Sequence, residues 1–432
     1  MKTTINESSV RALLTATVVY IAAWMSLHWA FAVWYGFKEA PKGTYDLRYE
    51  PVVNVFRQNF EQGFEREGAH LAIYYKGRQM VNVWNGFSDS ESQRKWTMRT
   101  KTVFYSATKA ISSLCVAMLV DRGRLSYDDL VVEYWPEYGQ FGKENTTIED
   151  VLTHKAGIPY MEDVTMEDVA NQELMMHKIE SAKPLWTPGT ATGYHAITFG
   201  WLLDGIVQKA DEKGRNIRTF FREEVAEKYG IDISIGLPKH EYGNLARATQ
   251  PGLFEYARDI LADPRMLAML ALMYLRMPDS IAAKLRMHPS WIPLNYDTVA
   301  LNDPDVVSLN MGAVTGVGNA DNFARLFSLA LDGTLISNRT LQLIAQPTVA
   351  NWHLEQVVLY PLVKGRGFFF EPHPSIKGAY LLGHPGYGGQ SLNVDVERRL
   401  VIAYVSNGLK TGTGEMCSAY QRILRTVFNV ID

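Results

Sequence analysis

The chain has 432 residues, of which 47% are hydrophobic and 12% aromatic, so it can bury a large core. Its formal net charge is −3 and it contains no Lys/Arg tract, so nucleic acid is not an expected partner. Two cysteines, Cys115 and Cys417, cannot form a disulfide framework or a cysteine-based metal site, and the sequence predicts neither a metal nor a cofactor.

The first predicted element is an apolar helix within residues 1–40. No Asp, Glu, Lys or Arg occurs between Arg11 and Lys38, and this stretch exceeds the roughly 20 residues that cross a bilayer. Trp29 and Trp34 near its end form part of an interfacial aromatic cluster. We expect a single-pass membrane anchor, with the rest of the chain luminal or extracellular. The alternatives are a cleaved signal peptide of a secreted protein, a buried helix of the fold, and a mitochondrial location.

Two β-rich runs follow the N-terminal segment and predict a hairpin. Residues 69–75 and 79–84 are separated by Lys76-Gly77-Arg78, a turn that contains glycine. A short helix over residues 52–67 is expected to precede the hairpin.

The next element is an apolar helix that opens with Ser106-Ala-Thr-Lys109. Its apolar positions recur at helical spacing, and Gly123 stands where a C-terminal cap would. Ser106 and Lys109 share one face, and the positive end of the helix dipole disfavours an ammonium ion there, so the lysine could take the serine proton. A second S-x-x-K copy, Ser92 to Lys95, lies in a polar run and is interpreted as a solvated loop.

The remaining chain divides into a helical part and a strand-rich part. Signals over residues 127–354 are mostly helical and are interrupted by Pro and Gly, and the Met-rich run 266–273 is predicted to be core. Short strands are then predicted at residues 365–370, 379–383, 390–395 and 400–405, and a final helix at residues 415–428.

Strands at both ends of the chain predict an α+β fold, an α/β sandwich. One antiparallel sheet would be built from N- and C-terminal strands with helices on its faces, and a helical insertion domain would lie beside it. The expected domains are residues 41–126 together with 355–432 for the sheet, and 127–354 for the helical insertion.

Four segments, in order along the chain, share a pattern with one enzyme superfamily. They are Ser106-Ala-Thr-Lys109, the block from Ile148 to Pro159, Tyr194-His195-Ala196, and His384-Pro-Gly386. The chain thereby resembles the serine β-lactamase and penicillin-binding-protein superfamily, and within it the carboxylesterase branch.

The resemblance implies acyl transfer through a covalent serine intermediate. Ser106 would attack the carbonyl, and Lys109 and Tyr194 would form the base pair, with the proton acceptor left open between them. The resemblance places the oxyanion between the backbone N–H groups of Ser106 and Tyr387, and Gly386 suits a close approach of the substrate.

Two positions depart from the superfamily pattern. Ala196 stands where the Y-x-N element has asparagine, with His195 in its middle as a candidate substrate contact. His384 replaces the lysine of K-T-G and would be a weaker, pH-dependent cation, or alternatively a turn residue bonded to backbone. Both changes favour esters or small amides over substrates that carry a carboxylate. His154 is interpreted as a structural hydrogen-bonding residue.

The sequence therefore predicts a membrane-anchored serine hydrolase that acts on a small-molecule ester or amide. The alternatives are a peptidase or amidase on the same scaffold, and a catalytically inactive protein that binds a partner or self-assembles. A homo-oligomer is compatible with the sequence, which does not decide it.

Overall fold

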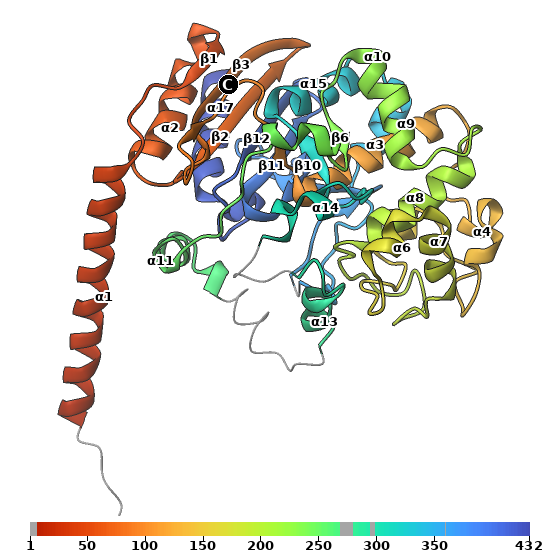
Figure 1. Cartoon of the computed structure of the whole chain (residues 1–432), viewed down its shortest axis with the longest axis horizontal. Helices are drawn as coiled ribbons and strands as arrows, with labels where there is room; N and C mark the ends of the chain where they lie inside the picture. The colour runs from red at the N-terminus through yellow and green to blue at the C-terminus, as the bar shows by residue number, and fades with distance from the viewer. Residues whose placement is uncertain (1–6, 268–279, 294–298, 359) are drawn as a thin grey trace, which may run out of the picture.

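The fold is built around an antiparallel β-sheet to which both ends of the chain contribute (Figure 1). The computed structural model describes residues 7–267, 280–293, 299–358 and 360–432. Within these residues the sheet has nine strands, in the order β1-β3-β2-β12-β11-β10-β9-β8 with β4 paired to β3. The strands are β1 Lys42–Tyr45, β2 Gly68–Tyr75, β3 Arg78–Asp89, β4 Arg94–Lys95, β8 Lys364–Gly365, β9 Phe368–Pro372, β10 Tyr380–Gly386, β11 Gln390–Asp395 and β12 Leu400–Ser406.

The pairing of β2 with β12 joins the two ends of the chain. Their antiparallel register runs from Tyr75 opposite Leu400 to Ala69 opposite Ser406. The predicted hairpin is formed by β2 and β3, and β3 continues to Asp89, beyond the predicted end at residue 84. The predicted sheet of N- and C-terminal strands is thereby confirmed.

Both faces of the sheet are covered, because its central strands are apolar on both sides. Along β12, Ile402 and Tyr404 belong to one buried cluster, whereas Val401 and Ala403 belong to the other. The first cluster includes α2 (Glu50–Glu61) and α17 (Ser418–Ile431). The second includes α3 (Thr108–Asp121) and α15 (Ala320–Leu331). The result is the predicted α/β sandwich.

The stretch between β5 and β8 contains most of the described helices. Its other helices are α4 Val131–Tyr134, α5 Ile148–Leu152, α6 Met166–Ala170, α7 Gln172–Ser181, α8 Thr198–Ala210, α9 Ile217–Phe221, α10 Glu227–Tyr229, α11 Leu253–Ala262, α13 Ile281–Met287, α14 Pro304–Val307 and α16 Asn338–Ile344. Sequence reasoning missed β6 (Ser234–Ile235) and β7 (Gly316–Gly318), which form a small sheet with β5 (Thr102–Val103). Strands this short carry too few residues for a periodic signal.

Two predicted helix boundaries are corrected by the structure. Ser106 lies in a 3₁₀ turn, Tyr105–Ala107, that precedes α3, so only Lys109 is in the α-helix itself. Helix α2 ends at Glu61 instead of residue 67, and Gly63 follows with a φ of 74°, a left-handed conformation that glycine adopts without strain.

Helix α1 (Glu7–Tyr35) projects away from the body (Figure 1). Among the described residues one helix is long and apolar enough to cross a membrane by length and composition, and its window Val10–Trp34 has no buried share. The alternative of a buried core helix is therefore wrong. The end of α1 docks closely on the body, because a side chain at Gly63 would come within 2.8 Å of the Ala32 Cβ.

The two cysteines are free and buried, so each packs as a small apolar residue. The Met-rich run is described only at its start, where Met266 is buried and Leu267 is 57% exposed. Residues 268–273 of that run lie outside the described residues.

Candidate active site

Ser106 lies at the junction between β5 and α3, in a turn whose backbone is strained. The preceding residue, Tyr105, has a φ of 49°, which is uncommon for a residue with a bulky side chain. Such conformations cost of order 1–3 kcal/mol and are often found at active sites. The turn packs against the end of β10, where a side chain at Gly386 would overlap the carbonyl oxygen of Phe104.

Lys109 is fully buried beneath Ser106. Its Nζ lies 3.5 Å from the Ser106 Oγ and donates to the carbonyl oxygens of Ala196 at 2.7 Å and Ala313 at 3.2 Å. Burial lowers the pKa of the amine well below its usual value of 10.5. The residue that lacks the superfamily's asparagine side chain, Ala196, therefore still contacts the lysine through its backbone.

Tyr194 reaches the same place from the segment that leads into α8. The Lys109 Nζ lies 4.8 Å from the centroid of the Tyr194 ring, and the Ser106 side chain neighbours the Tyr194 phenol. Burial raises the pKa of the phenol, and the neighbouring Ser106 side chain opposes that shift in part. The structure thus brings together Ser106, Lys109 and Tyr194, as predicted.

Glu355 holds the Tyr194 segment in place, and sequence reasoning missed it. Its carboxylate accepts a hydrogen bond from the backbone N–H of Tyr194, and others from those of Val357 at 2.7 Å and Val358 at 2.5 Å. Burial raises the pKa of Glu355, whereas the charge of Lys364 lowers it. No local pattern could have identified Glu355, because it contacts a residue 161 positions earlier.

Lys364 is a second buried lysine near this segment. Its side chain is fully buried, and its amine has no hydrogen-bond partner within the described residues. Burial lowers the pKa of Lys364 to about 8, while the carboxylate of Glu355 acts in the opposite direction. The carboxylate that holds the Tyr194 backbone is therefore accompanied by a nearby cation.

His384 lies on β10 and is uncharged. Its Nδ1–H donates to the carbonyl oxygen of Pro385 at 2.7 Å, and its ring stacks on Phe369 with the centroids 4.3 Å apart. Burial, aided by the charge of Lys109, lowers the pKa of His384 to about 3. Of the two expectations for His384, the lowered pKa contradicts the pH-dependent cation, whereas the bond to Pro385 agrees with a residue bonded to backbone. The neutral imidazole presents its buried Nε2 as an acceptor, without a partner in the described part of the chain.

Tyr387 follows β10 directly and lies beside the turn that carries Ser106. Its ring centroid is 5.7 Å from that of Tyr105, and its hydroxyl donates to Gln250 at 3.1 Å. The structure therefore brings Gly386 and Tyr387 to the strained turn, where the resemblance placed them.

His195 is positioned by backbone groups on both of its ring nitrogens. Nδ1–H donates to the carbonyl of Gly193 at 2.6 Å, and Nε2 accepts from the N–H of Ile158 at 3.0 Å. The backbone N–H of His195 donates to Nδ1 of His154 at 3.2 Å. Both histidines thus act in this structure as hydrogen-bonding supports, which was predicted for His154 but not for His195.

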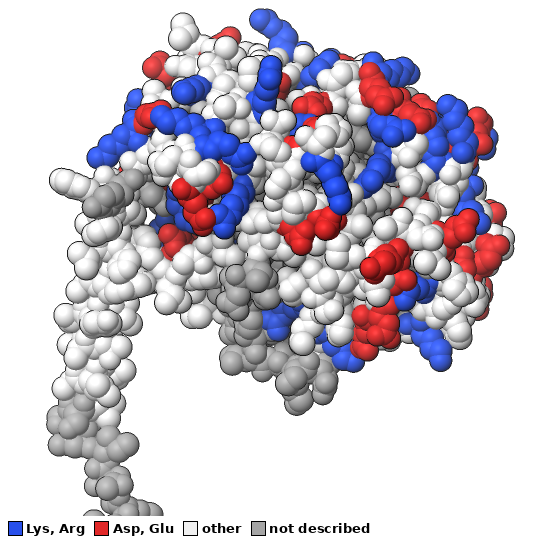
Figure 2. Space-filling view, viewed as in Figure 1, with Lys and Arg blue, Asp and Glu red and all other residues white. Residues whose placement is uncertain are grey.

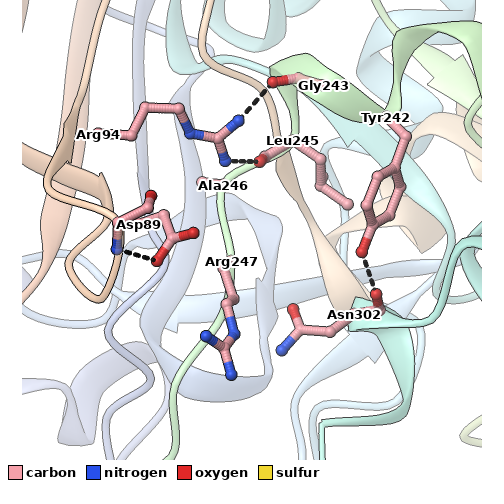
Figure 3. Close-up of a pocket in the computed structure, with 9 residues that line it drawn as sticks. Asp89, Arg94, Tyr242, Gly243, Leu245, Ala246, Arg247 and Asn302 are labelled. Atoms are coloured by element: carbon pink, nitrogen blue, oxygen red, sulfur yellow. Dashed lines mark hydrogen bonds between the residues drawn. The ribbon is translucent and has the colours of Figure 1, made fainter.

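The second S-x-x-K copy, Ser92 to Lys95, lies at the edge of a separate cavity of about 350 Å³ (Figure 3). Ser92 lines it, but Lys95 has a side chain that is 48% exposed and pairs with Glu39. Figure 3 shows the Arg94 guanidinium turned toward the carbonyls of Gly243 and Leu245, which accept from it at 2.5 Å and 2.8 Å. This serine and lysine are solvated, as predicted, and none of the three residues that converge on α3 lines the cavity.

Comparison with known proteins gives matches along most of the chain. Residues 56–425 match the family described as Beta-lactamase. One relative is the esterase/beta-lactamase LipL of Mycobacterium tuberculosis, 28% identical over 375 residues that cover 85% of this chain and 83% of LipL.

Solved structures show the same similarity. A penicillin-binding-protein homologue from Caulobacter crescentus has a TM-score of 0.75 and 27% identity, and the match covers 91% of this chain and 100% of that one. A family VIII carboxylesterase has a TM-score of 0.77 at 24% identity, over 90% of this chain and 99% of that one, which is a likeness of fold.

Proposed function

The chain belongs to the Beta-lactamase family, and from this premise we propose that it is a membrane-anchored serine hydrolase that cleaves esters through an acyl-Ser106 intermediate. The observation that carries the proposal is the buried amine of Lys109, 3.5 Å from the hydroxyl oxygen of Ser106. A nucleophilic serine needs a base of this kind, because its hydroxyl is a weak nucleophile at its ordinary pKa.

The surroundings of Lys109 suit a neutral amine. A neutral amine has two N–H donors and one lone pair, and the carbonyls of Ala196 and Ala313 accept two donors. The lone pair is then available for the third neighbour, Ser106. The lowered pKa of Lys109 acts in the same direction, because it raises the neutral fraction at neutral pH.

In the first step, Ser106 Oγ forms a bond to the carbonyl carbon of the ester while its proton passes to Lys109, directly or through the Tyr194 phenol. The backbone N–H groups of Ser106 and Tyr387 are the proposed donors to the oxyanion. The intermediate collapses by breaking the bond to the leaving oxygen, which departs as an alcohol with the same proton.

In the second step, water repeats this sequence on the acyl-serine. The base takes one proton from the water as its oxygen bonds to the acyl carbon, and the Ser106 oxygen leaves and recovers that proton. The products are a carboxylic acid and the free enzyme, so no metal or cofactor is required.

The neutral site favours esters over substrates that carry a carboxylate. His384 is uncharged where the superfamily places a lysine, and Ala196 offers no side-chain amide. The similarity to LipL, named an esterase/beta-lactamase, supports hydrolysis of an ester or of a β-lactam, and the neutral site is what favours the ester. Amide hydrolysis by the same residues is the second candidate, since both reactions share the acyl-serine.

Helix α1 is the proposed membrane anchor. Its exposed window Val10–Trp34 has 25 residues, about 37 Å at 1.5 Å per residue, which exceeds a hydrocarbon core of about 30 Å. A luminal or extracellular body stays part of the proposal, and a cleaved signal sequence is its alternative.

The test combines covalent labelling with kinetics. A tagged fluorophosphonate should modify Ser106, and Ser106→Ala and Lys109→Met should each lower kcat/KM for short p-nitrophenyl esters by about 10³-fold or more. Ser92→Ala and Lys95→Met, in the exposed copy of the same motif, are the matched controls and should leave kcat/KM unchanged. A panel of esters, amides and β-lactams then assigns the substrate class.

An unlabelled folded protein whose ester hydrolysis survives Ser106→Ala would overturn the proposal. A folded protein with no hydrolysis of any substrate in the panel would favour the binding or self-assembling alternative.

A further inference from the structure

Helix α11 (Leu253–Ala262) has an inverted pattern of burial. Two of its three charged residues, Arg258 and Asp259, are only 8% and 5% exposed, whereas Leu253 and Leu261 are 80% and 69% exposed. A helix on the surface of a water-soluble domain shows the opposite arrangement, with its apolar stripe facing the core. The outer side of α11 is therefore suited to an apolar surrounding.

The buried charges dock α11 on the body. Arg258 donates to the carbonyl of Gly63 at 2.6 Å, pairs with Asp259 at 3.1 Å, and lies 5.0 Å from the centroid of the Phe64 ring. Because this side of the helix is held by satisfied polar contacts, the opposite side must face outward. That opposite side, the leucine stripe, consists of Leu253, Ala257, Ile260 and Leu261, at the helical spacing i, i+4, i+7 and i+8.

Helix α11 also contacts the apolar part of α1. The Phe254 ring lies 5.6 Å from the ring of His28 and 6.2 Å from that of Trp24, and Figure 1 shows α11 beside α1. The contact is thus made within the helix that is the proposed anchor, well before its end at Tyr35.

The position of this contact along α1 determines how deep the contact lies in the bilayer. The apolar run begins after Arg11, so a core of about 20 residues placed as far from the body as possible extends from Ala12 to Phe31. His28 and Trp24 then lie about 5 Å and about 10 Å inside the edge of that core at about 1.5 Å per residue. Any other placement that keeps 20 apolar residues in the core buries them further.

We propose that α11 lies in the interfacial layer of the same bilayer leaflet that α1 enters from the body, with the leucine stripe facing the lipid. The inference rests on the anchoring role proposed above for α1. The length of α1 is compatible with it, because a 25-residue window exceeds the core and such helices tilt. A tilt can bring the side of the body that carries α11 onto the membrane.

Lipid fits the stripe better than a protein partner does. The stripe has no charged side chain, and it belongs to the helix that contacts α1 through Phe254. Above the lower end of α1, Figure 2 shows no Lys, Arg, Asp or Glu on the described part of that helix. An interfacial helix buries its apolar side about 5–10 Å into the boundary between headgroups and acyl chains, which matches the depth of the contact with α1.

The test measures membrane depth in the full-length protein reconstituted into phosphatidylcholine vesicles. A single cysteine is introduced by Leu261→Cys and labelled with an environment-sensitive dye. The labelling is selective for this cysteine because Cys115 and Cys417 are each 1% exposed. Val18→Cys on α1 and Lys228→Cys on α10 are the comparison sites, and α10 lies at the end of the body away from the direction of α1 (Figure 1).

The label at Leu261 should lose about half of its emission to lipids that carry a nitroxide near the headgroup. The label at Val18 should be quenched by nitroxides deep in the chains, and the label at Lys228 by neither. In a variant that carries Leu253→Glu and Leu261→Glu, a label on Ala257→Cys should no longer be quenched by nitroxides near the headgroup. Hydrolysis of a water-soluble ester should be unchanged in this variant.

If the Leu261 label is unquenched, like the Lys228 label, while the Val18 label is quenched, this inference is overturned and the anchor is left intact. Because these vesicles contain no other protein, that result would favour a protein partner for the stripe. Absence of quenching at Val18 would overturn both membrane proposals. Ester hydrolysis on the same vesicles reports separately on the proposed chemistry.

Discussion

Three histidines surround the candidate site, and burial keeps all of them neutral. The pKa of His195 and that of His384 are lowered to about 3, and the pKa of His154 is lowered well below 6.5. In each case the main cause is the loss of hydration of the charged ring. In the proposed mechanism the site relies on a lysine, a tyrosine and backbone dipoles, and its histidines are neutral hydrogen-bonding groups.

This neutrality predicts a dependence of stability on pH. Unfolded histidine takes up a proton near pH 6.5 and folded His384 near pH 3, so between these values the unfolded chain binds more protons. The free energy of unfolding should therefore fall as the pH decreases through this window, by about 1.4 kcal/mol per pH unit for each such histidine. In His384→Asn, the change in the free energy of unfolding per pH unit, measured by urea unfolding between about pH 6 and pH 4, should be smaller by that amount. His240→Asn, at an exposed side chain, is the control, and parallel curves for wild type and His384→Asn would contradict the prediction.

Glu355 provides the second prediction at the residue scale. In Glu355→Gln, one carboxylate oxygen becomes an NH₂ group that would face backbone N–H donors, so the Tyr194 segment should move. A displacement of about 1 Å in a reacting group costs about 10²-fold in rate, and we expect kcat for ester hydrolysis to fall by roughly that factor with a smaller change in KM. Glu180→Gln is a matched control, since Glu180 is partly buried and accepts from Trp135 at 2.7 Å. An unchanged kcat in Glu355→Gln would show that this carboxylate does not position Tyr194.

At the scale of elements, α3 is held by buried hydroxyl groups on its polar positions. Ser112 Oγ donates to the carbonyl of Gly312 at 2.6 Å, Ser113 Oγ donates to that of Gly367 at 3.0 Å, and Thr108 Oγ1 accepts from the N–H of Gly316 at 2.9 Å. These bonds fix the helix against loops from both the helical part and the sheet. The position of Lys109 therefore depends on how the helical part and the sheet pack together around α3.

The contact between β10 and the turn before α3 yields an element-scale prediction. In Gly386→Ala, the new methyl group would overlap the carbonyl oxygen of Phe104 and lie 2.8 Å from the Gln390 Cβ, so β10 and the turn must separate. We expect kcat/KM to fall by about 10²-fold and the unfolding temperature to decrease. Gly243→Ala is the control, because a Cβ there meets no atom within 4 Å. Normal activity in Gly386→Ala would contradict the proposed oxyanion position beside Tyr387.

At the scale of the whole molecule, a buried ion pair joins the two ends of the chain. Glu65, before β2, accepts from Lys410, after β12, at 2.5 Å and from the hydroxyl of Tyr404. Glu65 is 2% and Lys410 is 7% exposed. Lys410 also donates to Ser406 at 2.6 Å, so this network stabilises one end of the central β2–β12 pair.

Removal of one partner of this pair should be costly. Lys410→Met leaves a buried carboxylate without its cation and should lower the free energy of unfolding by about 3–5 kcal/mol, measured by urea denaturation. The double variant Glu65→Gln and Lys410→Met should recover part of that loss, because no unpaired charge remains. A single variant that costs less than about 1 kcal/mol would contradict the buried-pair reading.

The sequence by itself determined the features that depend on neighbours in the chain. The β-rich runs and the turn at Gly77 predicted β2 and β3, the apolar helical spacing after Ser106 predicted α3, and the long uncharged run predicted α1. Four short motifs in order were enough to indicate the family, because each keeps its residues within a few positions. The boundaries were less accurate, since one-turn segments such as Tyr105–Ala107 carry little periodic signal.

Only the tertiary structure decided the charge states and the distant contacts. His384 was expected to be either a pH-dependent cation or a residue bonded to backbone; it bonds to the Pro385 carbonyl, and burial by distant segments lowers its pKa to about 3. Glu355 and the inverted burial of α11 could not be predicted, since the partners Tyr194 and Gly63 lie far away in the chain. Hydration is lost only when distant segments pack together, and so the chemistry of a buried group follows from the fold and not from its flanking residues.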